Sequence, residues 1–371
     1  MKRVLFITNI ASPYRVCFFD ELGKNLDVTV LFHDSLDEHR NRAKEWFEPG
    51  TGGYHSVQLC NCIAKFGGER LCVDVINWLK KPFDAIVVCG YSSPTVMLAM
   101  AWMRLHRIPF FMEIDGGLIR EDSKLKYGIK KRLVSLANAW LSSGEYPTEY
   151  LVHYGAKRER VFAYPFSSLW EADLRETVVP EDEKRALRRE LGIEEEKMVL
   201  TVGQFIPRKG FDVLLRAAAS LDPQTGIYFV GGEPTEEYLQ LREKLGLSHV
   251  HFLGFRKKEE LARYYQAADL FVLPTREDIW GLVVNEAMAY GLPVVTTDKC
   301  VAGRELVEDG VNGYLVPAEN ASVLAEKIAA VLAGDPAAMG AASLEKIRPY
   351  TIENMVRAHV EILNQTNRKG E

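Results

Sequence analysis

Short apolar runs alternate with helical patterns along most of this chain, and the alternation begins a second time near the middle. Each run is continuous rather than alternating, which is typical of parallel strands buried on both faces. Helical segments between such strands indicate βαβ units and hence a doubly wound parallel sheet. The alternation therefore predicts an α/β protein with two parallel-sheet domains in tandem.

The predicted elements lie on either side of a charged stretch at 170–196, which has no strand character. Before it, we predict strands at 4–8, 28–32, 85–89 and 109–114 and helices at 18–23, 95–106 and 127–138. After it, we predict strands at 198–203, 227–231, 250–253, 270–274, 293–297 and 313–316 and a helix at 211–220. Pro180, followed by three acidic residues, is typical of a helix start. The sequence thus predicts domains at 1–170 and 171–350.

Composition and charge exclude several classes of protein. At roughly 150 residues per domain, 371 residues fit two domains, and 47% hydrophobic residues exclude general disorder. The net charge of −5 is the opposite of the basic footprint that nucleic-acid binding needs. We therefore expect no nucleic-acid partner.

The sequence also bears on location and redox state. The N-terminal apolar run is short and lacks a small-residue cleavage site, and no uninterrupted run reaches the roughly 20 residues of a membrane helix. We expect a cytoplasmic protein whose six cysteines are reduced thiols. Cys60 and Cys62 suggest a metal site, but no second pair stands at ligand spacing, so we expect no metal.

A first candidate site follows the strand predicted at 198–203. The strand ends at Gly203, and the next loop carries the adjacent cations Arg208 and Lys209 just before a helix. Cations beside a helix start suit a phosphate ligand. The alternative is a solvated loop whose Lys209-Gly210 only marks a surface turn.

A second candidate site follows the strand predicted at 270–274. An acidic loop contains Glu277 and Asp278, and Gly281 then opens an apolar helix that carries Glu286. A carboxylate in an apolar helix needs hydrogen-bonding partners, which are either structural groups or the hydroxyls of a ligand. The first N–H groups of this helix, near Leu282 and Val283, are free to approach an anion. Both sites lie at strand ends, where doubly wound sheets bind ligands.

These residues carry a family resemblance. The segment 201–317 resembles the family 4 (group 1) retaining glycosyltransferases, which have the GT-B fold. The shared motifs are Gly231-Gly232-Glu233-Pro234, Phe252-Leu253-Gly254-Phe255, the segment 268–274, the acidic loop, and the segment 310–317. The N-terminal half matches more loosely through 8–15. The helix predicted at about 351–367 resembles the family's closing helix, which packs back on the N-terminal domain.

The resemblance implies two facing Rossmann-like domains with a cleft between them. The N-terminal domain would bind the acceptor, and the C-terminal domain a nucleotide-diphosphate sugar. The protein would transfer the sugar with retention to a glycan or lipid-linked acceptor, in cell-surface polysaccharide or glycolipid synthesis. No cofactor or metal is implied, because side-chain cations would neutralise the leaving diphosphate.

The resemblance also implies roles on the donor side, with two departures from the family pattern. Lys209 matches the family's phosphate-binding Lys, but Gln204 stands where Arg is usual, and Arg208 is the candidate for the missing charge. Asp278 stands where the first acid is usually Glu, and Glu277 is the alternative. Glu286 would accept hydrogen bonds from the ribose. Backbone groups near Phe255 and Arg256 would contact the base.

On the acceptor side, strand-end loops would form the walls of the site. These walls would include Ser12, Pro13, Tyr14, Arg15 and Tyr91. Asp115 would bind or deprotonate the acceptor hydroxyl. The alternative for Asp115-Gly116-Gly117 is a plain turn.

The segment 124–134 is basic and amphipathic, which suggests contact with the anionic inner face of the plasma membrane; the alternative is a solvated helix face. Two other functions stay open. They are a nucleotide-sugar epimerase of the same fold and a non-catalytic module that binds nucleotide sugars. A nicotinamide dehydrogenase is disfavoured, because the first strand is not followed by G-x-G-x-x-G.

Overall fold

The computed structural model describes residues 1–34 and 52–365. The chain divides into two compact units, and each is described here by itself. Unit 1 comprises Met1–Ser168 together with Thr351–Glu371, and unit 2 comprises Leu169–Tyr350. Unit 1 is therefore built from two separate stretches of the chain.

Unit 1 contains a parallel sheet with the strand order β3-β2-β1-β6-β7-β8-β9. Its strands are β1 (Arg3–Thr8), β2 (Asp27–Phe32), β3 (His55–Gln58), β6 (Ala85–Cys89), β7 (Phe111–Ile114), β8 (Ala139–Ser142) and β9 (Val161–Ala163). The central strands are buried along almost their whole length, as the continuous apolar runs predicted. The order reverses between β1 and β6, so the loops after these strands diverge there.

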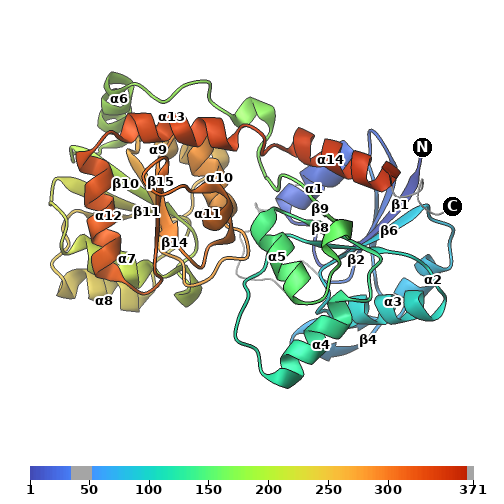
Figure 1. Cartoon of the computed structure of the whole chain (residues 1–371). Helices are drawn as coiled ribbons and strands as arrows, with labels where there is room; N and C mark the ends of the chain where they lie inside the picture. The colour runs from blue at the N-terminus through green and yellow to red at the C-terminus, as the bar shows by residue number, and fades with distance from the viewer. Residues whose placement is uncertain (35–51, 366–371) are drawn as a thin grey trace. The chain divides into compact units, whose positions relative to one another are not determined.

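Helices cover both faces of this sheet (Figure 1). They are α1 (Pro13–Leu22), α2 (Val75–Leu79), α3 (Pro94–Leu105), α4 (Lys124–Val134), α5 (Glu145–His153) and α14 (Ile352–Gln365). One core joins α2, α3, α4 and α5 to the sheet. On the other face α1 packs beside α14, and Phe18 of α1 lies edge-on to both Phe6 of β1 and His359 of α14.

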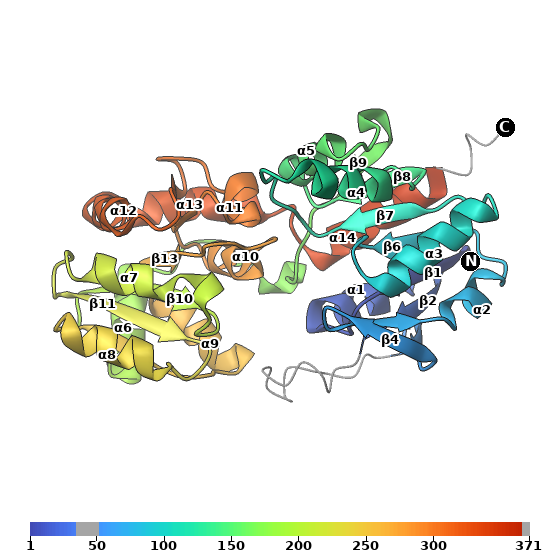
Figure 2. The same ribbon diagram turned by 90° about the horizontal axis from the view of Figure 1, so that it is seen from below.

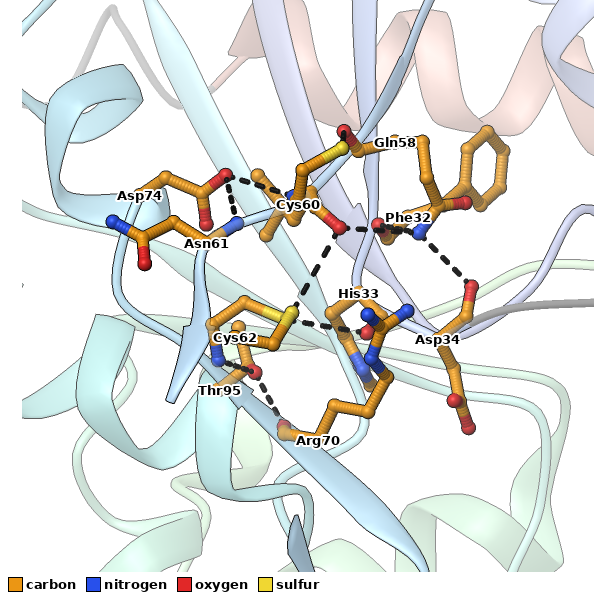
Figure 3. Close-up of a disulfide and its surroundings, with 12 residues drawn as sticks. Phe32, His33, Asp34, Gln58, Cys60, Asn61, Cys62, Arg70, Asp74 and Thr95 are labelled. Atoms are coloured by element: carbon orange, nitrogen blue, oxygen red, sulfur yellow. Dashed lines mark hydrogen bonds between the residues drawn. A yellow bond between two sulfur atoms is a disulfide. The ribbon is translucent and has the colours of Figure 1, made fainter. Parts of the chain in front are cut away.

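A two-stranded antiparallel hairpin of β4 (Cys62–Phe66) and β5 (Glu69–Cys72) lies outside the main sheet of unit 1. A disulfide joins Cys62 to Cys72 across it (Figure 3). The expectation of reduced thiols is therefore wrong for this pair, because hairpin pairing sets the two cysteines opposite one another. Cys60 is a free thiol, whereas Cys62 is bonded to Cys72. The two cysteines that suggested a metal site are therefore in different chemical states.

Unit 2 contains a second parallel sheet, with the order β12-β11-β10-β13-β14-β15. Its strands are β10 (Lys197–Val202), β11 (Thr225–Val230), β12 (Val250–Phe252), β13 (Leu270–Leu273), β14 (Val294–Thr297) and β15 (Gly313–Val316). The chain adds β11 and β12 on one side of β10 and then β13 to β15 on the other. The order therefore reverses between β10 and β13.

Figures 1 and 2 show helices on both faces of this sheet as well. They are α6 (Glu181–Leu191), α7 (Phe211–Ala218), α8 (Glu236–Lys244), α9 (Lys258–Ala267), α10 (Leu282–Ala289), α11 (Val301–Leu306), α12 (Ala321–Ala333) and α13 (Pro336–Ile347). The helices α7, α8 and α12 share one core with the sheet. Pro180 precedes α6 as its N-cap, with three acidic residues in the first turn, as predicted.

Two of the helices predicted in unit 1 have different boundaries in the structure. The first helix begins at Pro13 instead of 18, because Pro13 suits the first position of a helix. The helix predicted at 127–138 lies at Lys124–Val134, since Ser123 caps its start. The chain leaves that helix to enter β8, which together with β3, β9 and the hairpin was not predicted.

Candidate active site

The loops after β10 and β13 of unit 2 leave the sheet at the point where its strand order reverses. Ligands of doubly wound sheets bind beside such a point, at the carboxyl ends of the strands. The loop after β10 contains a 3₁₀ turn at Pro207–Lys209, and the loop after β13 leads to α10. The fold thus places both sequence-predicted donor loops at one edge of one sheet.

Glycines end the three strands β10, β11 and β12 at this edge. The N–H of Gly203 donates to Val230 O at 2.8 Å, and that of Gly231 donates to Gly254 O at 2.9 Å. A Cβ on Gly231 would lie 2.6 Å from Gly203 O, and the residue has φ 127°, so only glycine fits there. The glycines therefore let the ends of these neighbouring strands pack closely against one another.

Two cations and one carboxylate meet beside these glycines. The Nζ of Lys209 donates to Asp278 Oδ2 at 2.6 Å, and Arg208 Nη1 lies 3.0 Å from Asp278 Oδ1. The side chains of Lys209 and Asp278 are 12% and 13% exposed, whereas that of Arg208 is 45% exposed. The structure thus brings together three residues that the sequence analysis assigned to the diphosphate and the donor sugar.

Glu277, the alternative to Asp278, contributes its backbone to the same site. Its carbonyl oxygen accepts hydrogen bonds from Arg208 Nη1 at 2.7 Å and from Thr275 Oγ1 at 3.0 Å. The carboxylate of Asp278 contacts both Arg208 and Lys209.

The acidic loop is also fixed from its other side, by the segment that follows β14. The N–H of Asp278 donates to Lys299 O at 2.9 Å, and the N–H of Ala302 donates to Trp280 O at 2.9 Å. Gly281 precedes α10 as its N-cap, and the side chains of Leu282 and Val283 in the first turn are half-buried. Because the first N–H groups of a helix lack partners within it, this turn can donate to an anion.

Glu286 lies on α10, one turn beyond this helix start. Its Oε2 accepts a hydrogen bond from Tyr265 of α9 at 3.0 Å, and Tyr265 stacks on Tyr290 with ring centroids 5.1 Å apart. Burial raises the pKa of the Glu286 carboxyl to about 7. A carboxyl with one protein donor and a raised pKa has capacity to accept further hydrogen bonds from a ligand.

Two other predicted donor residues lie in the neighbouring loops. Gln204 follows Gly203, and the N–H of Ile206 donates to Gln204 O at 2.8 Å. Phe255, after β12, is exposed, and its carbonyl oxygen accepts from Arg256 Nη1 at 3.1 Å.

In unit 1, the predicted acceptor residues form a buried network around Asp115, which follows β7. Arg15 donates to Glu113 Oε1 at 2.7 Å and to Asp115 Oδ1 at 2.6 Å, while Tyr14 donates to Asp115 Oδ2 at 3.0 Å. Arg15 is buried and engaged by two carboxylates. It is therefore placed to orient Asp115 rather than to reach an acceptor itself.

The two carboxyls in this network differ in their electrostatics. Burial opposes ionisation of Glu113, yet Arg15 and His359 hold its pKa below the usual value. Burial, together with the charge of Glu113, raises the pKa of Asp115. Paired carboxyls whose pKa values are pushed apart are typical of acid–base sites.

The remaining acceptor-side residues lie around the start of α1 and after β6. Ser12 is buried at the N-cap of α1, and Pro13 opens the helix. The hydroxyl of Tyr91 contacts that of Tyr150 on α5. Tyr91 and Ser12 lie after β6 and β1, the two strands between which the sheet order of unit 1 reverses.

Sequence reasoning missed two residues that hold the donor loops, Tyr265 and Arg276. Tyr265 contacts Glu286 from a different helix, and nothing in the local sequence marks it. Arg276 stands inside the acidic loop, between the end of a strand and two acidic residues. A single cation at that place was a sequence signal that could have indicated an ion pair holding the loop.

The predicted membrane segment is α4. Leu125 and Ile129 are 75% and 49% exposed on this helix. Exposed basic residues flank them, namely Lys124, Lys126, Lys131 and Arg132. Lys130 instead pairs with Asp122 at 2.7 Å and does not belong to this face.

No helix within residues 1–34 and 52–365 has the length and apolar character to cross a bilayer. Over the same residues, no group of three or more His, Cys, Asp or Glu side chains is arranged to hold a metal ion.

Residues 183–348, which make up most of unit 2, match the family model described as Glycosyl transferases group 1. The D-inositol 3-phosphate glycosyltransferase of Mycolicibacterium smegmatis is 37% identical over 172 residues, which is 44% of this chain and 39% of that protein. The chain spans about two fifths of the length of the curated relatives it matches.

Solved structures resemble the whole chain. Anabaena HepE (Alr3699), in complex with UDP, matches with a TM-score of 0.76 and 21% identity over 98% of this chain and 100% of that chain. Sucrose-phosphate synthase from Thermosynechococcus elongatus matches with a TM-score of 0.75 and 19% identity over 99% and 100%. These likenesses confirm the predicted GT-B fold, and with the family match they confirm the resemblance drawn from the motifs.

Proposed function

We propose that this protein is a retaining glycosyltransferase, which moves a sugar from a nucleotide-diphosphate sugar to a glycan or lipid-linked acceptor. The observation that carries the proposal is the meeting of Arg208, Lys209 and Asp278 at the strand-order reversal of unit 2. The family match of unit 2 supports it, as does the binding of UDP by a protein of the same fold.

In this proposal, unit 2 holds the donor. Lys209, Arg208 and the first N–H groups of α10 bind the diphosphate, Glu286 accepts from the ribose hydroxyls, and Asp278 orients the sugar. The base lies against the backbone near Phe255 and Arg256. We assign no metal or cofactor to this step, because two side-chain cations already face the position given to the diphosphate.

The chemistry follows from where charge develops. The bond between the anomeric carbon and the diphosphate oxygen breaks, and the leaving diphosphate takes the electron pair. Fixed cations and helix N–H groups stabilise that charge without reorganising, which is the largest single contribution in many enzymes. The acceptor oxygen then bonds to the anomeric carbon from the same face, and its proton passes to a leaving phosphate oxygen.

Asp115 of unit 1 receives the acceptor hydroxyl in this proposal. Arg15 and Tyr14 fix both of its carboxylate oxygens. Its carboxylate accepts a hydrogen bond from that hydroxyl and orients it, while the proton passes to the leaving phosphate. Ser12, Pro13 and Tyr91 would line the same region.

We further propose that the protein is cytoplasmic and associates reversibly with the inner face of the plasma membrane through α4. The exposed Leu125 and Ile129 would enter the headgroup region, while Lys124, Lys126, Lys131 and Arg132 face anionic lipid. Lipid-linked acceptors would be reached there.

A thermal-shift screen against UDP-, GDP- and ADP-sugars tests the donor assignment. A ligand that binds only the folded state raises the melting temperature, so one base series should stabilise the protein and its free nucleoside diphosphate should do the same. No shift with any of the three series contradicts the proposal.

A non-catalytic nucleotide-sugar module is the second candidate, because Gln204 and Asp278 depart from the family pattern. Transfer or hydrolysis of the stabilising nucleotide sugar excludes that module. Conversion of the donor to its epimer without an acceptor would instead indicate the epimerase.

A further inference from the structure

Arg276 connects the two donor loops of unit 2 through its guanidinium. Its Nη1 donates to Pro207 O at 2.6 Å, and its Nη1 and Nη2 donate to the two carboxylate oxygens of Asp212 at 2.8 Å each. Pro207 begins the 3₁₀ turn that carries Arg208 and Lys209, and Asp212 lies in the first turn of α7. The side chain also contacts Glu319.

The backbone around Arg276 holds the same turn. Arg208 O accepts from the N–H of Arg276 at 2.8 Å and from Thr275 Oγ1 at 3.0 Å. Gly210, which ends the turn with φ 66°, lies so close that a Cβ there would stand 2.1 Å from Pro274 O. The two residues before Lys209 thus have their carbonyl oxygens fixed by Arg276, one through its side chain and one through its backbone.

The contacts of the guanidinium depend on its shape. One planar group serves a carbonyl and both oxygens of a carboxylate, which a lysine ammonium on a flexible stem does not reproduce. The pairing also affects Asp212: burial opposes its ionisation, and the hydrogen bonds from Arg276 hold its pKa below the usual value.

We propose that Arg276 is a positioning residue for the donor diphosphate. By fixing the Pro207–Lys209 turn against the loop that carries Asp278, it makes Arg208 and Lys209 converge on one point. It does so without touching the ligand. This inference rests on the proposed function, because it assumes that unit 2 binds a nucleoside diphosphate.

Calorimetry on the full chain tests the proposal. UDP, GDP and ADP identify the base that binds wild-type protein, and the diphosphate and monophosphate of that base are then titrated into the variants. Binding of the second phosphate depends most on the two cations pointing to the same position. Arg276→Ala should therefore weaken diphosphate binding at least tenfold and lower the ratio of diphosphate to monophosphate affinity, whereas general loosening of the unit weakens both ligands equally.

Arg216→Ala is the matched control, because Arg216 lies 4.0 Å from the same carboxylate of Asp212 but does not contact the turn. We expect its affinities to match the wild type. Arg276→Lys keeps the charge but should show the same binding defect as the alanine variant. If the alanine variant does not fold, the lysine variant is titrated in its place.

The outcomes separate the two claims. Wild-type binding together with an unchanged affinity ratio in Arg276→Ala or Arg276→Lys overturns the role of Arg276 and leaves the proposed function standing. Absence of binding of all three diphosphates to the wild type overturns both.

Discussion

Lys209 and Asp278 lie 69 positions apart in the sequence, yet Lys209 Nζ donates to Asp278 Oδ2 at 2.6 Å. Each comes from a different strand-end loop of unit 2, and Arg208 contacts the other oxygen of the same carboxylate at 3.0 Å. Asp278 is thus the counter-ion of the cations that the proposed function assigns to the diphosphate. In that proposal, an incoming diphosphate would share or displace the Asp278 carboxylate.

Replacing Lys209 with alanine should lower turnover by roughly 10²–10³, because one preorganised donor to developing charge is lost. The fold should persist, since Arg208 still pairs with Asp278. The measurement is transfer rate together with melting temperature. Lys244→Ala, an exposed lysine at the end of α8, is the control. Normal turnover of the Lys209 variant would remove this residue from the site.

Asp278→Asn should act on binding and turnover in opposite directions. It frees both cations from a competing carboxylate, so affinity for the bare nucleoside diphosphate should rise roughly two- to fivefold, in line with a partly exposed ion pair. Turnover should fall, because the group that orients the sugar has lost its charge. Calorimetry and a transfer assay measure the two effects, and weaker diphosphate binding would contradict the counter-ion role.

Glu286 predicts a pH dependence. Its carboxyl has a pKa of about 7 in the folded protein against 4.5 ordinarily, so between these values the folded state holds a proton that the unfolded chain has released. Its contribution therefore lowers the free energy of unfolding as pH rises from 4.5 to 7 and is constant above that. Glu286→Gln should remove this slope, measured by denaturation at several pH values.

The same group affects nucleotide binding. Because an ionised carboxylate accepts from ribose hydroxyls better than the protonated acid, wild-type affinity should rise relative to Glu286→Gln between pH 6 and pH 8. The difference is roughly tenfold at most for a pKa near 7. Parallel pH profiles for the two proteins would mean that Glu286 does not contact the nucleotide.

The disulfide between Cys62 and Cys72 should protect the hairpin of unit 1. A cross-link across about ten residues stabilises by about 3 kcal/mol at most in the chain-entropy model. Cys62→Ser should therefore speed amide hydrogen exchange in β4 and β5, as should a reductant. Cys60→Ser, at a free thiol in the same region, should leave exchange unchanged. Equal exchange in all three proteins would show that the cross-link adds nothing.

The exposed face of α4 should bind anionic vesicles. Wild-type protein should co-sediment with them at low salt and release at high salt, because screening weakens the lysine contacts. A variant with Leu125→Ala and Ile129→Ala should sediment less, whereas Lys346→Glu on α13 should match the wild type. No co-sedimentation of the wild type would end this part of the proposal.

Much of the fold could be read from the sequence where local chemistry decided it. Continuous apolar runs predicted the central strands of both sheets, because only doubly buried strands are apolar on every residue. The four residues of β8 could not be separated from the preceding helix, since Ala139–Ser142 is too short to show a period.

In the candidate site too, the residues in local motifs could be predicted from the sequence, and the contacts between distant residues could not. Lys209 and Asp278 were found because each stands in a loop with a motif. Arg15 was predicted to line the acceptor site. Nothing in the sequence around it shows that two carboxylates enclose it. Tyr265 and Arg276 were missed because their partners, Glu286 and Asp212, lie 21 and 64 positions away.

Because α14 packs on α1, the two ends of the chain complete the same unit. Because α14 follows unit 2 in the chain, unit 1 gains this helix during synthesis only after unit 2 has emerged and had time to fold. A chain that stopped before Thr351 would therefore contain all of unit 2 attached to a unit 1 that lacks α14.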